Sequence, residues 1–107
     1  MINLNCMSEN KNSGFLSVLQ DIIDDRKKRM PDDSYTTRLF TGGVNKIAQK
    51  VGEEAVELII EAKDNDDIRF KDEAADLLYH LLVLLSARGL RIEDIEEVLK
   101  SRHTTSK

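Results

Sequence analysis

Two stretches of apolar side chains at helical spacing constrain the fold more than any other feature of the chain. The first covers residues 44–62 and the second residues 68–87, and both follow a period of about 3.6 residues. The acidic segment 63–67 interrupts the pattern and supplies a cap for the second stretch, which Gly89 ends. The sequence therefore predicts two long helices joined by a short turn, which is an antiparallel hairpin.

Two shorter helices are expected on either side of this hairpin. One begins near Phe15 and stops before Met30-Pro31, and the last runs from Ile92 to about Arg102. Aromatic residues make up only 5% of the chain and Trp is absent, which favours helix packing over sheet. We therefore expect an all-α fold, a bundle of about four helices per chain built on the hairpin.

The remaining segments are less regular. Residues 1–13 are polar and aperiodic, so we expect a mobile N-terminal extension before a single domain over residues 14–107. A loop is expected from Pro31 to about Gly43. The tripeptide 34–36 within it suits either the cap of a short helical turn or a contact with a ligand, and local chemistry does not decide between the two.

The stretch from Leu77 to Leu85 is almost wholly apolar. A helix of this composition is usually buried on all sides, and the other predicted helices are too few and too short to cover it. A monomer would expose a large apolar patch. We therefore expect a homodimer in which a second copy of the chain completes the helical bundle.

Composition argues against several classes of function. The net charge of −4 disfavours non-specific binding to nucleic acid, and we interpret the basic run 26–29 as the end of a helix rather than as a phosphate-binding patch. No stretch is long enough to span a membrane, and no signal peptide is recognisable. Cys6 is the only cysteine, so neither an internal disulfide nor a zinc cluster is expected. We expect a cytoplasmic protein.

Acidic residues are paired at i, i+3 in both helices of the predicted hairpin. This spacing puts Glu54 and Glu57 on one face of the first helix, and Glu73 and Asp76 on one face of the second. One antiparallel register brings all four carboxylates to two adjacent levels. Such pairs can also be ordinary solvated faces, but Asp76 lies in a largely apolar stretch and is expected to be desolvated, where four carboxylates would need a cation.

The residue types indicate which cation this would be. Hard oxygen ligands without His or Cys select Mg²⁺, with Mn²⁺ as the alternative, over zinc. A di-iron site would need Glu-x-x-His, and neither His80 nor His103 has an acid three residues earlier. A magnesium ion held by carboxylates typically meets phosphate groups of a substrate.

Four further residues near the acids have two interpretations each. Lys46 and Lys50 lie one turn apart and could bind phosphates, or could simply pair with the neighbouring acids. Gly52 is unusual inside a helix and suggests the close approach of another helix or of substrate. His80 could touch substrate or be a hydrogen-bonded histidine of the core.

These motifs together resemble the phosphoribosyl-ATP pyrophosphohydrolase family of the all-alpha NTP pyrophosphohydrolase superfamily. The resemblance covers nearly everything from Phe15 to His103, and the pattern Glu-Glu-x-x-Glu followed by Glu-x-x-Asp looks like the superfamily's metal signature. The matching residues are Ser34-Tyr35-Thr36, Leu39-Phe40, Gly43, Lys46-Ile47, Lys50-Val51-Gly52-Glu53-Glu54-Ala55, Glu57 and Glu73-Ala74-Ala75-Asp76-Leu77-Leu78-Tyr79-His80.

The resemblance implies roles for individual residues. It implies catalytic roles for Glu53, which would support the site or position water, and for Lys50. The magnesium ligands that it implies are Glu54, Glu57, Glu73 and Asp76. The substrate-binding residues expected with them are Lys46, Lys50, Arg38, Ser34, Thr36 and His80.

The resemblance also implies the reaction, in which phosphoribosyl-ATP and water give phosphoribosyl-AMP and pyrophosphate in histidine biosynthesis. Relatives that destroy non-standard nucleoside triphosphates share the acidic motif, so a housecleaning pyrophosphohydrolase is the enzymatic alternative. A non-catalytic helical dimer for protein interaction is an alternative of another class, in which the acids form a solvated face.

Overall fold

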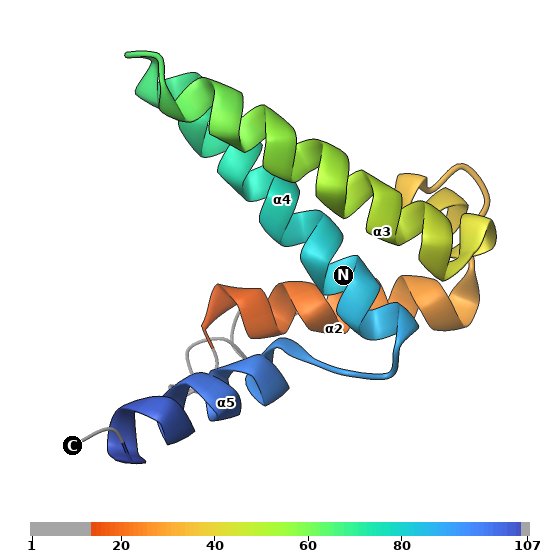
Figure 1. The fold of residues 1–107 in the computed structure, drawn as a ribbon. Helices are drawn as coiled ribbons and strands as arrows, with labels where there is room; N and C mark the ends of the chain where they lie inside the picture. Colours follow the sequence, from red (N-terminus) through yellow and green to blue (C-terminus); the bar gives the residue numbers. More distant parts are fainter. Residues whose placement is uncertain (1–13, 106–107) are drawn as a thin grey trace.

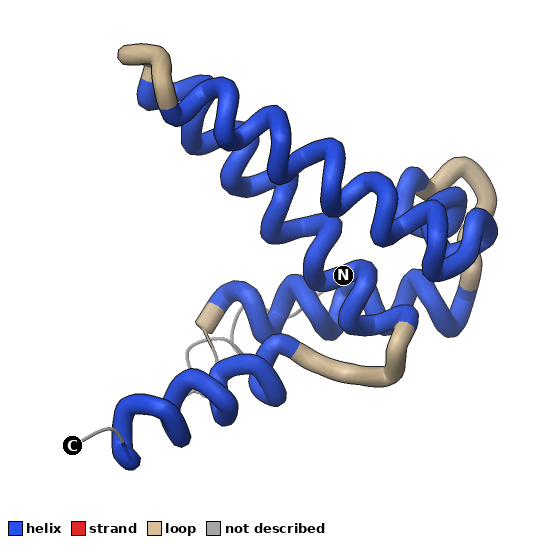
Figure 2. The backbone as a smooth tube through the Cα atoms, viewed as in Figure 1, coloured by secondary structure: helices blue, strands red, loops and turns tan. Residues whose placement is uncertain are grey.

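The computed structural model describes residues 14–105, which form helices joined by short turns and loops (Figures 1 and 2). The predicted N-terminal extension at residues 1–13 lies outside the described residues. No strand occurs between residues 14 and 105, so the predicted all-α class with about four helices is confirmed. The helices are α2 (Phe15–Arg29), α3 (Tyr35–Ala62), α4 (Asp67–Ala87) and α5 (Ile92–Thr105).

The predicted hairpin is formed by α3 and α4, which lie side by side along most of their length (Figure 1). Asp66 caps α4, because its side chain accepts a hydrogen bond from the backbone N–H of Arg69 at 3.1 Å. Across the turn, Arg69 donates to Glu61 with a distance of 3.0 Å between Nη2 and Oε2. The pairing of Glu61 with Arg69 follows the same antiparallel register that puts Glu54 level with Asp76.

The expected loop from Pro31 to Gly43 is wrong, because α3 already begins at Tyr35. The Ser34 side chain accepts a hydrogen bond from the backbone N–H of Thr37 at 3.2 Å, so the tripeptide 34–36 contains the helix cap that was one of its two interpretations. Gly43 has φ 88° and ψ 173° and kinks the helix. The chain therefore reaches the hairpin through a short helical segment rather than a loop.

The core lies where α2 crosses the hairpin beneath the end of α4 (Figure 1). Gln20 on α2 is fully buried within it. Its side-chain N–H donates to the carbonyl of Leu82 at 3.0 Å, and its side-chain oxygen accepts from the backbone N–H of Ile92 at 2.8 Å. One amide thus joins α2 to both later helices. The buried apolar residues of this core are Ile23, Leu39, Ile47, Leu82, Val83, Leu85 and Ile92.

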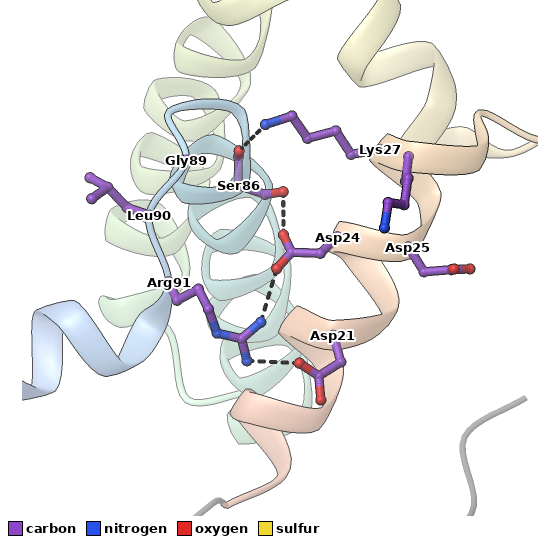
Figure 3. Close-up of a pocket in the computed structure, with 9 residues that line it drawn as sticks. Asp21, Asp24, Asp25, Lys27, Ser86, Gly89, Leu90 and Arg91 are labelled. Carbon is purple, nitrogen blue, oxygen red and sulfur yellow. Dashed lines mark hydrogen bonds and ion pairs between the residues drawn. The ribbon is translucent and has the colours of Figure 1, made fainter.

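A pocket lies beside α2, and ion pairs and hydrogen bonds connect the residues that line it (Figure 3). Arg91 lies 2.8 Å from Asp21 and 2.9 Å from Asp24. Lys27 donates to the carbonyl of Ser86 at 2.6 Å. The basic run 26–29 occupies the last turn of α2, as predicted for a helix end. These contacts fasten α2 to the turn between α4 and α5.

Both hairpin helices expose apolar side chains. Within residues 77–85 of α4, one chain already buries Leu82, Val83 and Leu85 and packs Leu81 and Leu84 against the core. The expectation that this stretch needs a second copy for its cover is therefore wrong for most of its residues. On the same helix, Leu78 is 40% and Ile68 72% exposed. Among residues 14–105, no helix has both the length and the apolar character needed to cross a bilayer.

Candidate active site

Three of the four acids that the predicted register would bring together lie close to one another between α3 and α4, and Glu57 is outside this group of three. One carboxylate oxygen from each of Glu54, Glu73 and Asp76 lies within 4.8 Å of the other two. Glu57 is close enough to Glu73 to raise its pKa, so it belongs to the same group of charges. We call these four residues the acid cluster.

The acid cluster is electrostatically strained. Desolvation, followed by repulsion from the other three carboxylates, raises the pKa of Glu73 above its ordinary value. The expected desolvation of Asp76 is wrong for the single chain, because this residue is exposed. Composition of the surrounding stretch was misleading, since Asp76 lies on the side of α4 that one chain leaves open. Desolvation instead acts on Glu73.

The donor set fits a hard divalent cation. All the side-chain donors of the cluster are carboxylate oxygens, and their mutual spacing allows several to bind one ion. A cation would also offset the repulsion that raises the pKa of Glu73. Glu54, Glu73 and Asp76 are therefore the residues whose spacing could hold a metal, and Glu57 adds negative charge beside them.

Lys50 lies at the edge of the acid cluster. Its ammonium is 3.6 Å from Glu53 and 3.7 Å from Glu54. Burial lowers the pKa of Lys50, but the phenol of Tyr35 and the two glutamate partners raise it by more, so the net shift is upward. Of the two interpretations of Lys50, the structure shows the pairing with neighbouring acids, and phosphate binding stays a prediction.

Glu53 makes its contacts with Gln49 and Lys50 on its own helix. It accepts a hydrogen bond from Gln49 at 2.9 Å, and this bond is the main reason that the pKa of Glu53 is lowered, with Lys50 and Lys46 adding to the effect. Glu53 is therefore a charged and oriented carboxylate at the rim. Lys46 is exposed one turn before Lys50.

His80 is buried at 5% exposure and uses both ring nitrogens. Nδ1 lies 2.7 Å from the backbone carbonyl of Asp76, and Nε2 lies 2.6 Å from the hydroxyl of Tyr35. This is the geometry of the hydrogen-bonded core histidine. Thr36 is also buried, and its hydroxyl is hydrogen-bonded to that of Tyr79.

Two other expected substrate residues lie near this point. Arg38 is exposed and its guanidinium carbon lies 5.9 Å from the centre of the Tyr35 ring. The hydroxyl oxygen of Ser34 accepts the hydrogen bond that caps α3. The structure thus brings Arg38 and His80 together around Tyr35, a residue that the sequence analysis did not assign to the site.

Gly52 is exposed, and an added Cβ would meet nothing within 4 Å. Of the two interpretations of Gly52, the close approach of another helix is not seen among residues 14–105, and the approach of substrate stays a prediction.

The comparisons with known proteins identify a family for this chain. The family model described as phosphoribosyl-ATP pyrophosphohydrolase matches residues 16–103, which contain the whole acid cluster. The histidine biosynthesis bifunctional protein HisIE of Bacteroides thetaiotaomicron is 55% identical over 92 residues, which are 86% of this chain and 45% of the relative. HisIE of Bacillus subtilis is 53% identical over 91 residues, 85% of this chain and 44% of the relative.

The chain spans under half the length of these curated relatives, so the likeness concerns one part of each. The family match covers most of the chain, and its range includes both helices of the hairpin. This chain therefore belongs to the phosphoribosyl-ATP pyrophosphohydrolase family.

Proposed function

We propose that the chain hydrolyses phosphoribosyl-ATP to phosphoribosyl-AMP and pyrophosphate in histidine biosynthesis, with Mg²⁺ or, in its place, Mn²⁺ held by the acid cluster. The observation that carries the proposal is the meeting of Glu54, Glu73 and Asp76 within 4.8 Å on two helices of a family member. An all-oxygen donor set beside a lysine suits a magnesium-bound polyphosphate. The lone cysteine, Cys6, agrees with a reducing cytoplasm as the setting.

Each part of the site has a separate task in this proposal. Glu54, Glu57, Glu73 and Asp76 would hold the cation, which when bound supplies charge shielding and makes water more acidic. The ammonium of Lys50 stabilises negative charge that grows on the departing pyrophosphate. Glu53 is held ionised by Gln49 and orients the attacking water. Lys46 and Arg38, both exposed on the same helix, offer further cations to the phosphates.

We propose that the active form is a homodimer that covers the outer face of α3. Val56 is 56% and Ile59 58% exposed, and both lie on one face of the helix with Gly52. Glycine at an exposed helix interior costs roughly 0.5–1 kcal/mol relative to alanine, and nothing in the same chain uses the space it leaves. A second helix packing on this face would account for both features.

Sedimentation of two valine variants tests the dimer. Val56→Glu should weaken association, because it buries a charge only when a second copy covers α3. Val98→Glu, at a comparably exposed valine of α5, is the matched control. A wild-type chain that sediments as a folded monomer at micromolar concentration would contradict the dimer.

Product analysis tests the activity itself. The protein is incubated with phosphoribosyl-ATP or with each of a panel of nucleoside triphosphates, with and without Mg²⁺. The proposal predicts phosphoribosyl-AMP and pyrophosphate from phosphoribosyl-ATP only when Mg²⁺ is present. Preference for non-standard nucleoside triphosphates would indicate a housecleaning enzyme, and absence of any turnover would favour a non-catalytic helical dimer.

A further inference from the structure

Tyr35 is held in one orientation from two sides. The His80 ring meets the Tyr35 ring edge-on, with 5.7 Å between centroids and an interplanar angle of 85°. Arg38 lies over the same ring at 5.9 Å from its centroid. The residue nevertheless remains 44% exposed, so its position is fixed while part of it is accessible.

The hydrogen bonds of His80 determine what the Tyr35 hydroxyl can do. A backbone carbonyl only accepts, so Nδ1 carries the hydrogen that is donated to Asp76 at 2.7 Å. In the neutral imidazole this leaves Nε2 as an acceptor, and the hydroxyl of Tyr35 donates to it at 2.6 Å. With its one hydrogen used, the Tyr35 oxygen offers only lone pairs to a ligand.

An oxygen of this kind repels phosphate and attracts a donor. Asp76 lies one helical turn before His80, and Tyr35 is hydrogen-bonded to His80, so the Tyr35 oxygen is held beside the turn of α4 that follows the acid cluster. Tyr35 is also close enough to Lys50 to raise its pKa. In a nucleotide whose phosphates lie at the acids and Lys50, the group next to the phosphates is the ribose, and its hydroxyls are donors.

We propose that Tyr35 accepts a hydrogen bond from a hydroxyl of the ribose that carries the triphosphate, and that His80 is a positioning residue acting through Tyr35. The proposal rests on the proposed function and adds a determinant of specificity to it. Tyr35 selects a ribonucleotide over its deoxy counterpart, whereas His80 itself, at 5% exposure, stays out of contact with substrate.

Two His80 variants separate the two hydrogen bonds. His80→Gln keeps an acceptor near the position of Nε2, so the Tyr35 hydroxyl keeps its hydrogen-bond acceptor. His80→Asn keeps a donor for the Asp76 carbonyl but removes the acceptor of the Tyr35 hydroxyl. Tyr35→Phe removes the hydroxyl outright. Tyr79→Phe is the matched control, because it removes the hydroxyl that joins Thr36 to Tyr79 between the same two helices.

The experiment measures kcat/KM for phosphoribosyl-ATP and for its 2′-deoxy and 3′-deoxy forms at the triphosphate-bearing ribose. The wild type should prefer the ribose form over one deoxy form by about tenfold, the worth of one hydrogen bond. Tyr35→Phe and His80→Asn should reduce this ratio to within about twofold, while His80→Gln and Tyr79→Phe should keep it. A merely structural role would slow all substrates alike and leave the ratio unchanged.

An active wild type that turns over all three substrates equally would overturn the proposal without any variant. A ratio that survives in Tyr35→Phe would also overturn it. An inactive wild type would contradict the proposed function instead, and calorimetric affinities for the same three nucleotides would then decide the role of Tyr35 by the same ratios.

Discussion

Replacing Lys50 by Met separates its two interpretations. Lys50 pairs with Glu53 at 3.6 Å and Glu54 at 3.7 Å, and its side chain is 28% exposed. Partly exposed pairs of this kind contribute about 0.5 kcal/mol each, so the variant should lose about 1 kcal/mol of folding free energy. If the ammonium also stabilises charge on the leaving pyrophosphate, its loss should cost about 3 kcal/mol of transition-state stabilisation, or roughly a hundredfold in kcat.

The assay combines steady-state kinetics on phosphoribosyl-ATP at saturating Mg²⁺, calorimetric Mg²⁺ affinity and thermal unfolding. We expect kcat to fall by roughly a hundredfold with a smaller change in KM, because the interaction strengthens as the bond breaks. Lys100→Met, at an exposed lysine on α5, should leave all three quantities nearly unchanged. A near-normal kcat together with weakened metal binding in Lys50→Met would refute the phosphate role and leave only ion pairing.

Three further changes test the packing and the electrostatics of the chain. Gln20→Leu should destabilise the fold by about 2–4 kcal/mol in chemical denaturation, because the carbonyl of Leu82 and the N–H of Ile92 both lose a buried partner; a loss under 0.5 kcal/mol would contradict this role. Gly43→Ala should cost about 1–2 kcal/mol, because its φ of 88° is strained for alanine, and an unchanged melting temperature would show that the kink relaxes. Hydrogen bonds from Arg91 and then from Ser17 lower the pKa of Glu93 from 4.5 to about 2. The ionised Glu93 therefore stabilises the fold above pH 4.5, and this contribution is lost as the pH falls toward 2. After screening of a side chain that is 43% exposed, the effect should be about 1 kcal/mol. Between pH 4.5 and 2, the free energy of unfolding should therefore fall less in Glu93→Gln than in the wild type. An equal fall in both proteins would refute the stabilising role of Glu93.

The hairpin and its register could be predicted because two independent constraints agree on them. The spacing of apolar residues predicts the two helices. The i, i+3 acid pair on each helix predicts their register, because pairing the two sets of acids puts Glu54 level with Asp76. The structure adds the Glu61 to Arg69 ion pair in the same register. These features depend on local periodicity, which a sequence displays directly.

The features that were missed depend on contacts between distant residues. Tyr35 and His80 are 45 positions apart, and nothing in either local pattern indicates that they meet. The segment from Tyr35 to Gly43 was predicted to be a loop, whereas the structure makes it a short helical segment. Its end is set by the positive φ of Gly43, an angle that the sequence does not show. The exposure of Asp76 was misjudged because the composition of a stretch does not say which side of the helix a single residue occupies.

The measurement that tests the central claim most directly is the affinity of the protein for Mn²⁺, followed by electron paramagnetic resonance, in the wild type and two charge variants. Glu73→Gln removes one acid of the cluster and should abolish tight binding and metal-dependent hydrolysis, while relief of repulsion stabilises the metal-free fold. Glu97→Gln, at an exposed acid of α5, should bind and turn over like the wild type. Equal Mn²⁺ affinity and turnover in all three proteins would contradict the assignment of the acid cluster as the metal site.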